Sequence, residues 1–62
     1  LTAAEIHLQL AGALERTGDL PAARKHVLWA LEETPRYRAA QVRLLEIKQK
    51  LDEQSPKSGG GS

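Results

Sequence analysis

Apolar residues recur every three or four positions in three stretches of the chain, which is the spacing of one face of a helix. In residues 1–17 the apolar positions are Ile6, Leu10, Ala13 and Leu14. In residues 20–34 they are Leu20, Ala23, Val27, Ala30 and Leu31. In residues 36–54 they are Ala40, Leu44, Ile47 and Leu51. The pattern predicts three amphipathic helices and an all-α fold, with Glu15 and Arg16 on the water-facing side of the first helix.

The first predicted helix has both a start signal and a stop signal. Thr2 followed by Glu5 is the spacing of a capping box, in which each side chain accepts a hydrogen bond from the other residue's backbone amide. Leu1 and Ile6 are spaced to form a hydrophobic staple across that cap. Gly18 supplies the left-handed residue that ends a helix.

The second predicted helix is bounded in the same way. Asp19 is a good N-cap, and Pro21 falls in the first turn, where a missing amide hydrogen does no harm. Pro35 disfavours helical geometry at Thr34 and ends the helix. Because the connection between the first two helices is very short, we expect them to pack as an antiparallel hairpin.

The third predicted helix, residues 36–54, carries apolar residues on more than one side. Val42 and Leu45 lie off its main stripe. Residues 55–62 read SPKSGGGS, the composition of a flexible linker, and the SGGGS end is typical of an engineered one. Since the chain also lacks an initiator methionine, we interpret it as a fragment of a longer protein.

Composition narrows the possible functions. With 62 residues and no cysteine, the chain has neither a disulfide nor a thiolate metal site to stabilise a small core. A net charge of +1 and only two aromatic residues give no basis for nucleic-acid binding. No apolar run reaches the length of a membrane span. We therefore expect no cofactor, no metal, no nucleic acid and no membrane among its ligands.

The stretch AEIHLQLAGALERTGDLPAARKHVLWALEETP resembles the 34-residue tetratricopeptide repeat. The matching positions are Leu10, Ala11, Leu14, Gly18, Asp19, Ala23, Val27, Ala30, Leu31 and Pro35. His7 and Val27 are smaller than the residues that the family prefers at their positions. A shift of 34 residues also places the third helix on the first, with Leu10 on Leu44 and Ala13 on Ile47.

The resemblance implies a right-handed α-solenoid fragment over residues 1–54, made of one helix hairpin and a third, capping helix. A plain three-helix bundle is the alternative. Repeats of this family bind peptides or proteins along a concave face formed by the first helix of each repeat. By position, this face holds Glu5, Leu8, Gln9, Gly12, Arg16, Val42, Arg43, Glu46, Gln49 and Lys50. Of the family's carboxylate clamp, only Arg43 is present, so we do not expect that mode of binding.

Three apolar residues are candidates for contact with another polypeptide. In the repeat register Trp29 lies on the outward side of the second helix, beside Lys25 and His26. It either covers its own helix and Tyr37 or forms a contact hot spot. Val42 and Leu45 should be bare, because no further helix of the repeat follows. We expect self-association through Trp29, Val42 and Leu45, or coverage by a flanking segment.

Neither the distribution of charge nor any catalytic group points to a function other than polypeptide binding. Basic residues predominate between 36 and 50, either as a solvated helix face or as a strip for an acidic peptide. His7 and His26 lie on different helices without metal-ligand spacing, and the adjacent Glu32 and Glu33 point to different sides. We therefore expect no catalytic residues.

The expected function is a protein–protein interaction module that binds a peptide or protein segment. The alternatives are a homo-oligomerisation element that uses the exposed apolar edge of the third helix, or a non-catalytic accessory domain of a larger enzyme.

Overall fold

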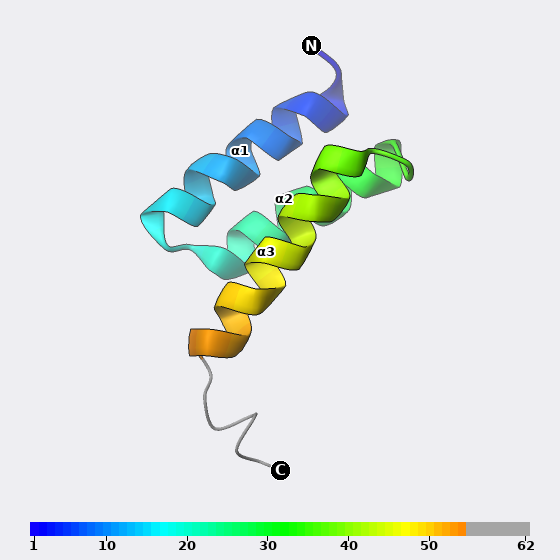
Figure 1. Cartoon of the computed structure of the whole chain (residues 1–62). Coiled ribbons are helices and arrows are strands. Elements are labelled where there is room, and N and C mark those ends of the chain that lie inside the picture. Colours follow the sequence, from blue (N-terminus) through cyan, green and yellow to red (C-terminus); the bar gives the residue numbers. More distant parts are fainter. Residues whose placement is uncertain (55–62) are drawn as a thin grey trace.

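A computed structural model describes residues 1–54 of the chain; the linker predicted for residues 55–62 lies outside them. The described residues form three helices, α1 (Ala3–Thr17), α2 (Leu20–Glu33) and α3 (Arg38–Gln54), and contain no strand. The all-α prediction is confirmed. Consecutive helices run in opposite directions (Figure 1). α2 packs against both neighbours, whereas α1 and α3 meet over only a few residues.

The predicted caps of α1 are present. The Thr2 amide donates to Oε1 of Glu5 over 2.7 Å, and the Glu5 amide donates to Oγ1 of Thr2 over 3.1 Å. Gly18 has a φ of +93° and ends the helix in the left-handed region, which favours glycine. The predicted hydrophobic staple between Leu1 and Ile6 buries little surface, because Leu1 remains 86% exposed.

The connections on either side of α2 follow its local sequence. The Asp19 side chain accepts a hydrogen bond from the Ala22 amide, as expected of an N-cap. α3 begins two residues later than the predicted Arg36. The Tyr37 amide donates to the Thr34 carbonyl over 3.0 Å, which forms a turn there and delays the helix to Arg38.

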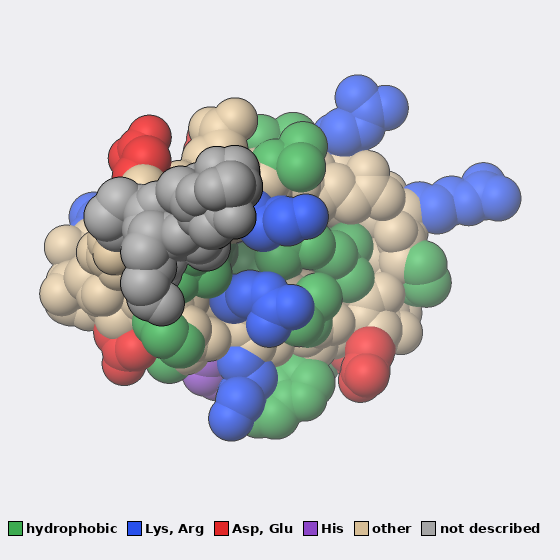
Figure 2. All heavy atoms as spheres, turned by 90° about the horizontal axis from the view of Figure 1, so that it is seen from below, with side chains coloured by type: hydrophobic (Ala, Val, Ile, Leu, Met, Phe, Trp, Pro, Cys, Tyr) green, Lys and Arg blue, Asp and Glu red, His purple; other side chains and the backbone are tan. Residues whose placement is uncertain are grey.

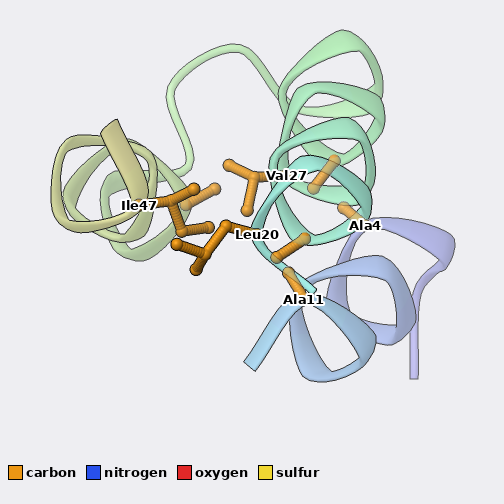
Figure 3. Packing of buried hydrophobic residues seen from close by; sticks show 8 residues of the cluster. Ala4, Ala11, Leu20, Val27 and Ile47 are labelled. Atoms are coloured by element: carbon orange, nitrogen blue, oxygen red, sulfur yellow. The ribbon is translucent and has the colours of Figure 1, made fainter. Parts of the chain in front are cut away.

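The core is built from small residues. The buried hydrophobic residues are Ala4, Ala11, Leu20, Ala23, Val27, Ala30, Ala40 and Ile47. Ala4 and Ala11 lie between α1 and α2, whereas Ile47 points from α3 toward Leu20 and Val27 (Figure 3). Alanine faces allow α1 and α2 to approach closely, and the larger side chains fill the space between α2 and α3. The stripes predicted for the second and third helices are confirmed.

The face predicted for the first helix is only partly right, since Leu14 packs against the core but Ile6 and Leu10 do not. Ile6 and Leu10 are 46% and 45% exposed, and Glu15, which was expected in water, is only 8% exposed. The buried face of α1 instead carries Ala4, Ala11, Gly12 and Glu15. α1 is turned so that its small residues lie at the centre of the contact, with Leu8 and Leu14 partly buried beside them.

Substitution of Ile47 tests the part of the core that α3 contributes. We expect Ile47→Ala to lower the free energy of unfolding by about 2–5 kcal/mol, because it leaves a cavity against α2. A domain of this size has only about 3–5 kcal/mol in total, so this variant should be largely unfolded. Ile47→Val should remain folded and lose about 1 kcal/mol. Urea unfolding followed by circular dichroism measures both.

The matched control for this substitution is Leu45→Ala on the same helix. Leu45 is 62% exposed, so its truncation should change the free energy of unfolding by less than about 0.5 kcal/mol. Equal losses from the substitutions at positions 45 and 47 would contradict the packing described here.

Candidate functional site

Glu15 is the residue that links α1 to α3. It lies in the last turns of α1, and its carboxylate faces α3. Nη1 of Arg43 lies 2.8 Å from Oε1 of Glu15, and Nζ of Lys50 lies 2.7 Å from Oε2. One carboxylate therefore binds two cations of α3, with a separate oxygen for each. Because α1 and α3 share few other contacts, these ion pairs form the polar bridge between them.

Gly12 makes room for this bridge. A Cβ atom placed on Gly12 would lie 3.6 Å from Nη2 and 3.7 Å from Cζ of Arg43. The guanidinium group therefore passes directly over the backbone of α1 on its way to Glu15. A methyl group would still fit at ordinary contact distance, but a longer side chain at position 12 would have to share this space with Arg43.

The two cations keep the carboxylate charged although it is nearly buried. The Glu15 side chain is 5% exposed, and those of Arg43 and Lys50 are 37% and 52% exposed. The hydrogen bond from Lys50 has the largest effect on the pKa of Glu15 and lowers it; burial opposes this, and Arg43 adds to it. The net result is a pKa below the ordinary glutamate value. Glu46 lies 3.8 Å from Arg43 and contributes a weaker contact.

Two adjoining hollows follow this bridge along the groove between α1 and α3. The larger, of about 530 Å³, is lined by Glu15, Arg16, Arg43, Glu46, Gln49, Lys50 and Glu53. The smaller, of about 340 Å³, is lined by Leu8, Gln9, Gly12, Arg16 and Arg43. Arg16 and Arg43 belong to both hollows, so the two form one groove. Its lining carries charges of both signs.

Most of the residues predicted for the concave face lie in this groove. Those that line it are Leu8, Gln9, Gly12, Arg16, Arg43, Glu46, Gln49 and Lys50. Val42 does not line it and is 47% exposed, and Glu5 belongs to the cap of α1. Sequence reasoning missed Glu15 and Glu53. Glu15 could have been found, because it lies four residues after Ala11, which lies seven residues after Ala4. These spacings place all three residues on one face of a helix.

The basic residues of α3 do not form a separate strip. Arg43 and Lys50 turn toward α1 and bind Glu15, whereas Lys48, two positions before Lys50, lies on another side of the helix. Basic side chains lie among hydrophobic ones on the face seen from below (Figure 2).

A second cluster joins α1 and α2. The Nδ1 atoms of His7 and His26 lie 3.1 Å apart, so one ring donates its Nδ1 hydrogen to the other. The Trp29 ring lies 5.2 Å from the His7 ring and 5.1 Å from the His26 ring, centroid to centroid. Sequence reasoning had not paired the two histidines; the hairpin brings them together. Trp29 packs on this pair and is still 43% exposed.

Neither cluster has the side chains of a metal centre. Within residues 1–54 there is no group of three or more histidine, cysteine, aspartate or glutamate residues that could hold a metal ion. In the same part of the chain no helix has the length and apolar character needed to cross a membrane. In comparisons with known proteins, no family model, no curated protein and no solved structure matches this chain.

The lowered pKa of Glu15 predicts how stability depends on pH. As the pH falls below the ordinary glutamate value of 4.5, the unfolded chain takes up a proton at Glu15 before the folded chain does. The free energy of unfolding should therefore fall with pH in this range. Glu15→Gln should lack this part of the pH dependence. At neutral pH it should unfold more easily by about 1–3 kcal/mol, because its charged hydrogen bonds are lost.

Urea unfolding of both proteins between neutral and acidic pH tests this prediction. The matched control is Glu53→Gln, since Glu53 also lines the groove but takes part in none of the ion pairs found in residues 1–54. The role assigned to Glu15 would be wrong if Glu15→Gln kept the full pH dependence of the wild type.

Proposed function

We propose that this chain is a protein-interaction module of the tetratricopeptide-repeat type, which binds an extended polypeptide segment in the groove between α1 and α3. The observation that carries the proposal is the groove itself. It is formed by two adjoining hollows and lined by side chains from both helices. A segment bound there would contact α1 and α3 at once.

The packing of the hairpin supports a repeat of this type. Ala11, Ala23 and Ala30, which stand at the small positions of the repeat pattern, are all 0% exposed. Their burial places α1 close to α2 and leaves the side of α1 that carries Leu8 and Gly12 to face α3. Such close packing within the hairpin is what a stacking repeat requires.

The lining of the groove indicates the chemistry of the ligand. Arg16, Arg43 and Lys50 contribute three positive charges, and Glu15, Glu46 and Glu53 contribute three negative charges. A ligand of one charge sign would meet as much repulsion as attraction. We therefore propose a polar segment that carries both acidic and basic side chains.

Selection from a displayed library of random peptides tests this function. Peptides selected on the immobilised chain should carry both charge signs and should bind less tightly to Arg16→Gln, by about tenfold or 1.4 kcal/mol. Arg16 is the chosen position because it lines both hollows and belongs to none of the ion pairs of residues 1–54. Fluorescence anisotropy of labelled peptides gives the affinities.

The matched control is Arg24→Gln, which removes an exposed positive charge from α2 outside the groove. It should bind the selected peptides as tightly as the wild type does. Equal weakening by the two arginine substitutions would contradict binding in the groove.

Self-association is a second candidate function, and the exposure of α3 supports it. Val42 and Leu45 are 47% and 62% exposed and lie three residues apart on one side of the helix. Leu45 stands 34 residues after Ala11, which is fully buried against α2. A second copy that covered this side of α3 would bury apolar surface that the hairpin leaves in water.

Sedimentation over a concentration series tests self-association. The wild type should form dimers as its concentration rises, and Val42→Gln/Leu45→Gln should stay monomeric with unchanged helix content, because it removes the apolar surface. The control is Lys48→Gln, which removes no apolar area and alters an exposed residue of α3 that takes part in none of the ion pairs of residues 1–54. A folded wild-type monomer at every concentration would exclude this candidate.

A further inference from the structure

A third hollow, of about 260 Å³, lies on the hairpin beside the second cluster. It is lined by His7, Trp29, Glu32 and Glu33. The sequence predicted that Glu32 and Glu33 point to different sides of α2, but both side chains line this hollow. The two histidines hold the Trp29 ring in place from one side, since His26 meets it edge to face at 78° and His7 meets it at 53°. The ring is nevertheless 43% exposed. An aromatic surface is thus fixed in position next to two carboxylates.

The two carboxylates stand where a helix disfavours them. Glu32 and Glu33 end α2, at the negative end of its dipole, and its last turn contains no basic residue. The Thr34 amide donates to the Ala30 carbonyl, but Pro35 has no amide hydrogen to donate to the next carbonyl, that of Leu31. The ion pairs of residues 1–54 all involve Glu15 or Arg43, so neither Glu32 nor Glu33 is neutralised by one.

We propose that this hollow binds a cationic side chain, a lysine or an arginine of a partner polypeptide. The ammonium or guanidinium group lies against the Trp29 ring, whose face attracts cations, and pairs with Glu32 and Glu33. The last turn of α2 adds its own negative potential.

The chemistry of the hollow favours an organic cation over a metal ion. A metal ion needs several converging oxygen or nitrogen ligands, and residues 1–54 contain no such group of three. A tryptophan face, in contrast, binds cations that are carried on alkyl or planar groups and are incompletely hydrated. This site involves α1 and α2 and is separate from the groove between α1 and α3, so the two can be tested independently.

Trp29 is the only tryptophan of the chain, so its fluorescence reports directly on this hollow. Titration with an acetylated tri-lysine amide should give a saturable change, and tri-glutamate should give none. In Glu32→Gln/Glu33→Gln the tri-lysine affinity should fall at least about fivefold, because both charges are removed. The control is Asp52→Asn, which removes an exposed carboxylate of α3 that lines neither this hollow nor the groove, and it should keep the wild-type affinity. Added salt should weaken wild-type binding.

Thermal unfolding separates loss of the site from loss of the fold. Glu32→Gln/Glu33→Gln should melt at a higher temperature than the wild type, because two charges are removed from the unfavourable end of α2. Trp29→Leu, measured by calorimetry, should also bind tri-lysine more weakly. Three results would overturn the proposal: no saturable change in the wild type, equal tri-lysine affinity in Glu32→Gln/Glu33→Gln, or a Trp29 signal that follows protein concentration without peptide and so reports a second copy.

Discussion

The nearly buried carboxylate of Glu15 is the interaction on which the arrangement of the groove depends. α2 packs on both neighbours through apolar side chains, but α1 and α3 meet over only a few residues. Arg43 and Lys50 span that gap and reach one carboxylate from two positions on α3. Ion pairs of this kind contribute little net stability compared with apolar side chains of similar size, and more to choosing one arrangement over others. Here they fix the relative position of the two walls of the groove and leave those walls polar.

Local chemistry predicted most of the fold because it determines where helices begin and end. The capping box at Thr2, the left-handed Gly18 and the N-cap Asp19 act through neighbouring residues, so the sequence is sufficient to place them. The stripes of α2 and α3 were also predicted correctly, since each stripe has large and small apolar residues on one face. The face of α1 was predicted only in part, because two of its large residues, Ile6 and Leu10, lie away from the buried Ala4 and Ala11. Close packing against α2 selects the alanine face, and hydrophobic periodicity weighted toward large residues points to the other.

The candidate sites were predicted only as far as they depend on the position of residues within one helix. Positions such as Arg16, Arg43 and Lys50 could be assigned to one groove from the register of a helical repeat, without knowing their contacts. The pairing of His7 with His26 could not, because it depends on the register between α1 and α2. Glu15 was assigned to water because a glutamate is rarely buried unless it is paired, and its partners lie 28 and 35 residues further along the chain. Both the Glu15 ion pairs and the cluster of His7, His26 and Trp29 therefore depend on contacts between helices, which the sequence of one helix does not reveal.

The distribution of large apolar side chains also bears on what the molecule does. Among the described residues only Leu20, Val27 and Ile47 are both larger than alanine and in the buried core. Six more are partly buried against that core: Leu8, Leu14, Leu31, Tyr37, Leu44 and Leu51. Seven large apolar residues are exposed: Leu1, Ile6, Leu10, Leu28, Trp29, Val42 and Leu45. Full burial of one such side chain is worth about 1.5–3 kcal/mol, so much of the hydrophobic stabilisation open to this chain is not realised within it. In the function proposed above, contact with another polypeptide buries part of this surface, and the polar groove and the negative end of α2 determine which polypeptide fits.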